Sequence, residues 1–162
     1  PCPTLKTMEY DIDTINEFLI ESNKIEGENS QGAHNDSLKA WAYLITQDHL
    51  NIANVIEAHR ILMEYLRPDI AGRLRKANVR VGNWNAPNPG QVRRMLIQWF
   101  SEPTTELGIK QVHISFEKIH PFEDGNGRVG RIIMNWQRVK NNLPILVIRT
   151  GNQQQEYYKW FK

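Results

Sequence analysis

A glycine-rich turn inside a run of charged residues constrains this chain more than any other feature. Residues 120–131 read His-Pro-Phe-Glu-Asp-Gly-Asn-Gly-Arg-Val-Gly-Arg, and apolar residues at helical spacing continue to Trp136. The pattern predicts that residues 125–127 form a loop that opens a helix. The first N–H groups of a helix have no partner within it and, together with the helix dipole, attract anions. Glycine also allows the backbone to approach such an anion closely.

The side chains around this turn suit the chemistry of a polyphosphate. Arg128 and Arg131 are three residues apart, so they project to about the same side of the predicted helix and can both reach phosphate oxygens. Asp124 stands where a carboxylate could hold Mg²⁺ that the phosphates also bind. His120 lies at the other end of the loop and could accept a proton from an attacking hydroxyl near neutral pH. These residues indicate a nucleotide-dependent transferase.

The same run matches HxFx[DE]GNGRxxR at every position and so resembles the signature of the Fic family, whose members mostly transfer AMP from ATP to a protein hydroxyl. The resemblance implies that His120 is the general base and that Asp124 binds Mg²⁺. It further implies that Gly125, Asn126 and Gly127 form an anion hole. Arg128 and Arg131 would bind the outer phosphates. Phe122 would point into the core. Doc-type relatives that transfer a phosphate carry a bulkier loop, so this loop favours nucleotidyl transfer.

Composition and charge are those of one ordinary globular unit. The 162 residues are 40% apolar and 23% charged, with a net charge of +2, and we expect a single domain over residues 1–162. The only basic cluster (Arg73, Arg75, Lys76 and Arg80) is predicted to be a solvated loop face rather than a nucleic-acid footprint. Cys2 is the only cysteine, and neither a signal peptide nor a long apolar run is present. We therefore expect a cytoplasmic protein that binds neither membranes nor nucleic acid.

Helical periodicity dominates the chain and predicts an all-α fold, a Fic-type helical bundle with one small β-hairpin. A first helix capped by Asp11 or Asp13 should end at Gly27, and Asn51 to Leu66 gives the clearest apolar stripe. Leu38, Trp41, Ala42 and Ile45 give a second apolar stripe. Further helices are predicted from Pro89, from Ile109 to the motif, after the motif, and from Gln153 to Phe161. Val79 and Val81 alternate as a short strand would, while residues 143–148 are too short a run to assign.

Residues 22–27 form the second informative segment. Ser22 and Glu26 would share one face of the first helix, and Glu26 would stand near its C-terminus, where the helix dipole disfavours a carboxylate. The segment resembles the [ST]xxxE[GN] motif of autoinhibited Fic proteins. That resemblance makes residues 11–27 an inhibitory helix in which Glu26 pairs with Arg131 and displaces the γ-phosphate. The alternative is a solvated glutamate before a helix-ending glycine.

Residues 78–88 resemble the Fic flap, a hairpin that covers the site and holds the target segment by main-chain pairing. In close relatives, residues that match Val81, Gly82, Asn83 and Trp84 line the nucleotide site, as do two tyrosines like Tyr157 and Tyr158. The alternative for each is an ordinary loop or core residue. His59 and His113 fall on apolar stripes and are predicted to be packed in the core. His113 and His120 are seven residues apart, but no third ligand supports a zinc site.

Taken together, these features predict an autoinhibited protein adenylyltransferase. Its substrates would be MgATP and a Ser, Thr or Tyr hydroxyl of a protein target or of the enzyme itself, and homo-oligomerisation stays open. Two other functions remain. Some relatives with a built-in inhibitory glutamate remove AMP instead, which would make Glu26 catalytic. A nucleotide-sensing interaction module would bind ATP and transfer nothing, although it would have no need of the base at His120.

Overall fold

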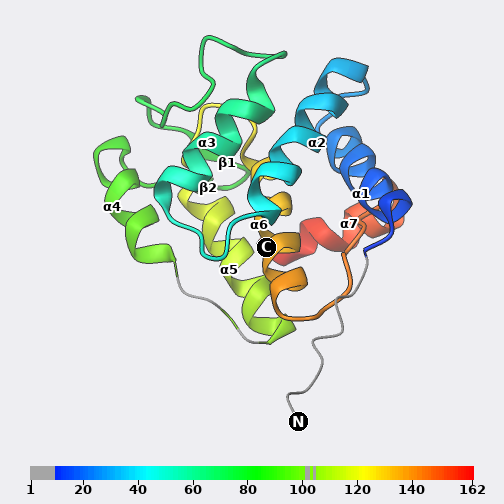
Figure 1. Ribbon diagram of the computed structural model, residues 1–162. Coiled ribbons are helices and arrows are strands. Elements are labelled where there is room, and N and C mark those ends of the chain that lie inside the picture. The colour runs from blue at the N-terminus through cyan, green and yellow to red at the C-terminus, as the bar shows by residue number, and fades with distance from the viewer. Residues whose placement is uncertain (1–9, 101–102, 104) are drawn as a thin grey trace.

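The computed structural model describes residues 10–100, 103 and 105–162, so Cys2 lies outside the described residues. Helices make up most of this part of the chain, with one two-stranded hairpin (Figure 1). The elements are α1 (Ile12–Ile25), α2 (Gln31–Ile45), α3 (Ile52–Met63), β1 (Arg80–Val81), β2 (Trp84–Asn85), α4 (Pro89–Trp99), α5 (Glu106–Ile119), α6 (Asn126–Lys140), α7 (Asn152–Tyr158) and the 3₁₀ helix η1 (Lys159–Phe161). The predicted all-α fold is confirmed.

The helix that follows the motif, α6, lies at the centre of the molecule. In Figure 1, α1 and α2 lie on one side of α6 and α5 on the other, with α4 outside α5. The largest apolar cluster joins Val129 and Ile133 of α6 to side chains from α1, α3 and α5, including Phe18, Leu62 and Phe116. Burying these side chains supplies the main stabilisation of the fold and fixes both ends of α6.

Helix ends follow the signals in the sequence. Asp11 caps α1 by accepting a hydrogen bond from the N–H of Asp13, and Pro89 occupies the first position of α4. Asn51 and Asn54 form a reciprocal capping box at the start of α3. Gly27, with φ +73°, ends the α1 region in a conformation that suits glycine.

Several local predictions need correction. The helix predicted to Leu66 ends at Met63, because residues 64–66 form a turn, and Ala42 of the α2 stripe is exposed. Val79 lies just before β1 rather than in a strand. The helix after the motif already begins at Asn126, so Gly127 belongs to its first turn and only Gly125, with φ +80°, lies in the loop.

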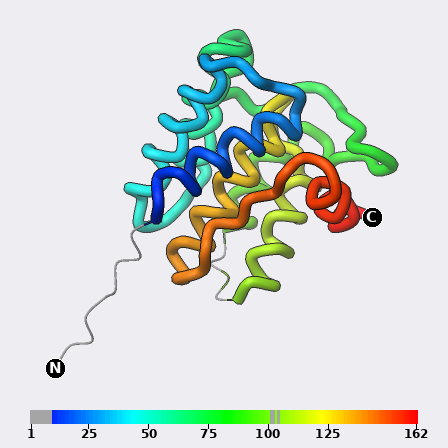
Figure 2. Tube along the Cα trace, turned by 90° about the vertical axis from the view of Figure 1, so that its right-hand side faces the viewer, coloured from blue at the N-terminus to red at the C-terminus, as the bar shows by residue number. Residues whose placement is uncertain are grey.

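Residues 143–148, which the pattern left unassigned, form no helix or strand and run back along α6 (Figure 2). The buried side chain of Asn135 holds this segment by donating to the carbonyl of Leu146 and accepting from its N–H. Within the described ranges, no helix combines the length and the apolar character that crossing a membrane requires.

The hairpin is short and is anchored at its base to the motif loop. Arg80 pairs with Asn85 and Val81 with Trp84, around a turn in which Gly82 has φ +57°. Just before the hairpin, an antiparallel bridge joins Leu74 to Phe122 of the motif. The flap therefore rises from the strand-like segment that lies against the motif loop.

Candidate active site

His120 stands at the C-terminal end of α5 in a conformation that is uncommon outside glycine. Its φ of 48° and ψ of 62° place it in the left-handed region, and its N–H closes the helix by donating to Phe116 at 3.0 Å. Burial lowers the pKa of the His120 imidazole, and the positive charge of Arg75 lowers it further, although the backbone carbonyl of Glu117 acts in the opposite direction. The ring is therefore neutral at pH 7, as a proton acceptor must be.

The loop after His120 is held from inside by two residues. The side chain of Asn126 bonds both the N–H and the carbonyl of Phe122, each at 2.9 Å, so the loop closes on itself. Phe122 is fully buried, as the family resemblance implied, and stacks on His59 with ring centroids 3.7 Å apart. The Asn126 side chain is thus occupied within the loop, which leaves its backbone N–H as the group that can face an anion.

His59 fixes the loop through a defined tautomer. Its Nδ1 accepts from the N–H of Gly72 at 3.0 Å, so the proton resides on Nε2, which donates to the carbonyl of Asp124 at 2.9 Å. Burial lowers the pKa of His59 to about 4, and the ring stays neutral. The prediction of a packed core histidine is confirmed, and the contact with Asp124 adds a positioning role that the sequence pattern did not indicate.

The N-terminus of α6 has the features of an anion site. Gly125 precedes the helix without any side-chain cap, so the first amides of α6 are available to a ligand. Arg128 lies beside them and is only 4% exposed. Its Nη2 lies 3.8 Å from Asp124 Oδ1, while its Nε and Nη1 are buried and have no partner among the described residues. A buried guanidinium with free donors at a helix N-terminus fits a phosphate group well.

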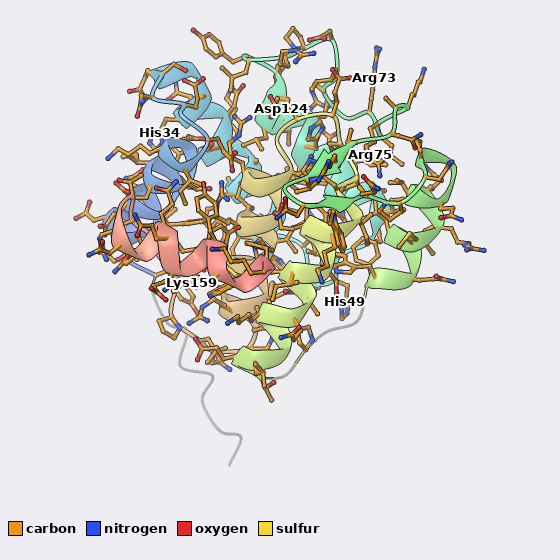
Figure 3. The ribbon with its side chains drawn as sticks, turned by 180° about the vertical axis from the view of Figure 1, so that it is seen from behind. His34, His49, Arg73, Arg75, Asp124 and Lys159 are labelled. Atoms are coloured by element: carbon orange, nitrogen blue, oxygen red, sulfur yellow. The ribbon has the colours of Figure 1, made fainter. Side chains whose placement is uncertain are left out.

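Asp124 is the residue at this loop that could hold a divalent cation. Its carboxylate is exposed, and Oδ1 accepts from the N–H of Gly125 at 2.6 Å. No group of three His, Cys, Asp or Glu side chains among the described residues could hold a metal by itself. A single carboxylate fits Mg²⁺, which usually keeps most of its ligands as water and substrate phosphate. Figure 3 shows Asp124 at the same end of the molecule as Arg73 and Arg75.

Arg131 lies one turn further along α6, is buried, and donates hydrogen bonds to Ser22 of α1 and to Glu26 just after it. Its Nη2 donates to Glu26 Oε1 at 2.6 Å and to the carbonyl of Ser22 at 2.9 Å, while Nε donates to Ser22 Oγ at 2.8 Å. Burial alone would lower the pKa of Arg131, but Tyr157, Glu26 and Glu117 raise it, so the guanidinium stays charged. The predicted ion pair between Glu26 and Arg131 is therefore present, within one chain.

Gly127 makes room for that ion pair. A Cβ placed at residue 127 would overlap Glu26 Oε1 and lie 2.9 Å from Arg131 Nη1. Glycine is needed here for close approach rather than for an unusual backbone angle, since Gly127 is helical. The first turn of α6 and the end of α1 are therefore in direct contact.

The two tyrosines behave differently. Tyr157 is buried, with its hydroxyl 2.8 Å from His113 Nε2 and 3.3 Å from Arg131 Nη1. His113 is a packed core histidine, as predicted, and burial lowers its pKa to about 3. Tyr158 is 45% exposed, and its hydroxyl accepts a hydrogen bond from Gln154 at 2.9 Å. The structure brings Tyr157 into the cluster of Arg131 and leaves Tyr158 at its edge.

Among the flap residues, Gly82 and Asn83 are exposed at the turn, and Val81 and Trp84 are half-buried. The ring of Trp84 carries the ammonium group of Lys118 at 4.9 Å from its centroid, which ties the hairpin to α5. The flap stands beside the motif loop through this contact and through its base, and no described hydrogen bond joins residues 81–84 to Arg128 or Arg131.

Two residues near the site were misjudged or missed from the sequence. Arg75, assigned to a solvated face, is 5% exposed and donates to the backbone carbonyls of His120, Ala77, Pro87 and Ile119 at 2.6, 2.9, 2.6 and 3.2 Å. The assignment was wrong because a count of charges cannot distinguish a solvated guanidinium from one that carbonyls surround.

Glu117 lies one turn before His120 on α5 and was not singled out. Its Oε1 is buried without a hydrogen-bond partner and packs against Gly130, where a Cβ would lie 2.5 Å away. Burial raises the pKa of Glu117 to about 7, although Arg131 acts to lower it. The one sequence signal for Glu117 is that it precedes His120 by about one helical turn.

Fold and site together define a helical domain with a base, an anion-binding helix start and a charged helix contact at one junction. The family model described as Fic/DOC matches residues 49–137, and the chain belongs to this family. It is 30% identical over 130 residues to the protein adenylyltransferase Fic of Drosophila erecta and 31% identical over the same length to that of Drosophila persimilis. Each alignment covers 75% of this chain but only 26% and 25% of the relative, so the chain spans about a quarter of those proteins.

Solved structures agree on the fold. Fic-1 (residues 134–508) from C. elegans superposes with a TM-score of 0.80 at 19% identity, covering 93% of this chain and 56% of that one. A Fic domain containing signaling protein from Bacteroides thetaiotaomicron gives a TM-score of 0.74 at 16% identity, covering 95% of this chain and 76% of that one. These identities are low, so the likeness concerns the arrangement of the helices.

Proposed function

We propose that this protein is an adenylyltransferase that moves AMP from MgATP to a Ser, Thr or Tyr hydroxyl of a protein, which can be the enzyme itself. The observation that carries the proposal is the junction of α5 and α6. There His120, held in a left-handed conformation, adjoins a helix start with open amides and the buried, partly unpartnered guanidinium of Arg128. The curated relatives named protein adenylyltransferase Fic support the same reaction.

In the proposed reaction, neutral His120 accepts the proton of the target hydroxyl as its oxygen bonds to the α-phosphorus. The bond from that phosphorus to the bridging oxygen breaks, and pyrophosphate leaves. The amides of Asn126 and Gly127 and the Arg128 side chain stabilise the charge that develops on the phosphates. Asp124 is suited to hold Mg²⁺, which would offset phosphate charge. A positioned base contributes roughly 10²–10⁴ to the rate.

We further propose that Glu26 holds this activity in check. Arg131 donates from Nη2 to Glu26 at 2.6 Å and from Nε and Nη2 to Ser22, while its Nη1 lies 3.3 Å from the Tyr157 hydroxyl. The guanidinium therefore has few donors left for a γ-phosphate. Two unit charges about 4 Å apart attract by about 4 kcal/mol at an effective dielectric near 20, before desolvation is subtracted. That attraction is large enough to misplace one phosphate while the rest of the nucleotide still binds.

Removal of AMP from a modified target is the rival function. The Glu26 side chain is 36% exposed although Arg131 is buried, so water can reach the carboxylate that would direct it. In that case Glu26 is a catalytic residue rather than an inhibitor, and His120 would return a proton to the leaving hydroxyl.

One experiment separates these functions. Wild type, Glu26→Gly, His120→Ala and the double variant are incubated with Mg²⁺ and ATP labelled at the α-phosphate, and incorporation into protein is followed. The proposal expects strong labelling by Glu26→Gly only. Equal labelling by the double variant would refute the role of His120, and loss of AMP release from a premodified target in Glu26→Gly would favour the rival.

A further inference from the structure

The positive charge of this protein is segregated to one stretch of the chain. No Asp or Glu occurs between Asp69 and Glu102, while the same stretch contains six basic residues: Arg73, Arg75, Lys76, Arg80, Arg93 and Arg94. The stretch carries +6 in a protein whose net charge is +2, so the remainder carries −4. It comprises the strand-like segment beside the motif, the flap and α4.

These basic side chains differ from the others in their surroundings. Elsewhere, ten Lys and Arg side chains have a carboxylate within 4.0 Å: Lys24, Lys39, Arg60, Arg67, Arg128, Arg131, Arg138, Lys140, Arg149 and Lys159. Within the stretch Arg75 is buried among carbonyls, and the other five are exposed and form no ion pair with any described carboxylate. Asp69, whose charge Arg73 senses, is already held by Nε and Nη2 of Arg67. Like charges gathered without counterions attract an anionic partner.

Three of the five lie on the segment beside the motif loop and on the flap. Arg73 and Lys76 flank the Leu74–Arg75 segment, which bonds to the motif through the Leu74–Phe122 bridge and from the N–H of Arg75 to the carbonyl of Pro121 at 3.0 Å. Arg80 lies on β1, at the base of the flap. Figure 3 shows Arg73 and Asp124 at the same end of the molecule.

A cavity opens at the base of the flap, and its lining suits a carboxylate. It measures about 450 Å³ and is lined by Asn78, Val79, Arg80, Asn85, Ala86 and Asn88. Arg80 Nε donates to the carbonyl of Gly82 at 3.2 Å, while its two Nη groups bond no described residue. Amide donors and a guanidinium, with no acidic side chain in the lining, can bind one or two carboxylates.

We propose that the basic surface formed by Arg73, Lys76 and Arg80 binds an acidic segment of the target protein. Asp or Glu residues beside the modified hydroxyl contact Arg73, Lys76 and Arg80, with one carboxylate in the flap cavity. This inference rests on the proposed function, because it assumes that a protein segment approaches His120 along the flap. The two-stranded flap leaves strand edges free to pair with such a segment.

A nucleic acid is the other polyanion that positive charge attracts, and the surroundings favour it less. Single strands bind on exposed aromatic rings interleaved with basic residues. The one aromatic side chain of the flap, Trp84, is half-buried and already carries Lys118 on its ring at 4.9 Å. Carboxylates on an extended peptide match a strand edge with scattered cations better than stacked bases do.

Fluorescence anisotropy of labelled peptides tests the proposal without requiring catalysis. Three nine-residue peptides share a central Val-Thr-Val and carry three Glu, three Gln or three Lys residues at each end, and a single-stranded oligonucleotide is the fourth probe. We expect the Glu peptide to bind at least about ten-fold more tightly than the Gln peptide at low salt, with the difference shrinking at 0.5 M salt.

The key variant is Arg73→Gln/Lys76→Gln/Arg80→Gln, and the matched control is Lys39→Gln/Arg149→Gln/Lys159→Gln, which removes the same charge from exposed sites on α2, near α7 and on η1. Only the key variant should lose the preference for Glu. Equal binding of the Glu and Gln peptides, equal loss in both variants, or tighter binding of the oligonucleotide at the same three residues would overturn the proposal.

The proposed function fails separately from this inference. If the protein labels itself in the Glu26→Gly background but does not distinguish the peptides, the proposed transferase function stands and the proposed binding of an acidic segment is refuted. If the protein prefers the Glu peptide but transfers no AMP, the proposed binding of an acidic segment stands and the proposed transferase function is refuted.

Discussion

Glu26 and Gly127 are separated by a hundred residues of chain, yet they touch so closely that a methyl group on residue 127 would overlap the Glu26 carboxylate. The contact joins the last residue of the α1 region to the first turn of α6, and it is possible only because residue 127 lacks a side chain. The same approach lets Glu26 reach Arg131 at 2.6 Å. A side chain at position 127 would therefore force the ends of Glu26 and Arg131 to shift.

Gly127→Ala should be destabilising only while Glu26 is present. The new methyl group displaces the ends of Glu26 and Arg131, and loss of a partly buried charged hydrogen bond costs about 1–3 kcal/mol. In the Glu26→Gly background the overlap with Glu26 is gone, and the remaining 2.9 Å approach is to the flexible end of Arg131, which is no longer paired with Glu26. Alanine in a helix is then favoured over glycine by roughly 0.5–1 kcal/mol. A double-mutant cycle by urea denaturation measures the coupling, and equal effects of Gly127→Ala in both backgrounds would contradict it.

Arg75→Lys should be nearly as damaging as Arg75→Ala. The guanidinium donates to four carbonyls from three points of the chain, and a lysine ammonium cannot span them. We expect either variant to lose about 2–4 kcal/mol of unfolding free energy, since buried acceptors and a buried charge are left without partners. The matched control is Arg73→Lys, an exposed change that should stay within about 0.5 kcal/mol. If denaturation shows that Arg75→Lys leaves the unfolding free energy nearly unchanged, the four carbonyl contacts of Arg75 do not stabilise the protein as proposed.

Glu117 should make the protein less stable as the pH rises from about 4.5 to about 7. Because its folded pKa of about 7 lies above the ordinary value, the folded state binds the proton more tightly, and that contribution is lost as the pH rises through this window. The slope cannot exceed about 1.4 kcal/mol per pH unit for one group.

His59 and His113 act in the opposite direction. Their folded pKa values of about 4 and about 3 lie below the ordinary value, so the stability that they contribute is present above pH 6.5 and lost as the pH falls. The difference in stability between wild type and Glu117→Gln removes their effect, because both proteins contain them. That difference should fall with pH up to about 7 and then stay constant; a flat difference from pH 5 to 8 would show that Glu117 does not titrate there.

Tyr157→Phe should cost about 1–3 kcal/mol of unfolding free energy, because it removes a buried hydroxyl shared by His113 and Arg131. Tyr158→Phe, next along the chain, removes an exposed hydroxyl bonded only to Gln154 and should cost less than about 0.5 kcal/mol. Thermal unfolding of the two variants compares them directly, and similar losses would show that the buried cluster contributes little.

Local signals predicted most of the helices. Asp11, Asn51 and Pro89 act at helix starts through contacts within a few residues, which a sequence pattern can represent. The motif predicted which side chains meet at the α5–α6 junction for the same reason, since twelve consecutive residues contain them all.

Long-range contacts were harder to foresee. Arg75 reaches carbonyls more than forty residues away, so nothing near it in the sequence marks it as buried. Ala42 lies on a helical stripe but is exposed, because its neighbours in space and not its spacing determine its burial. Gly127 was assigned to a loop because glycine usually breaks helices, whereas here it serves a contact made by a different helix.

The anchoring of α1 limits how Arg131 can be set free. Phe18 and Leu19 fix this helix in the core with 2% and 1% of their surface exposed, whereas Glu26 follows its last turn and keeps part of its carboxylate in water. Removing the whole helix would expose the core, but turning one side chain about its own bonds would not. The ion pair with Glu26 can therefore open on the fast timescale of side-chain rotation, while Ser22 still holds the Arg131 guanidinium from the other side.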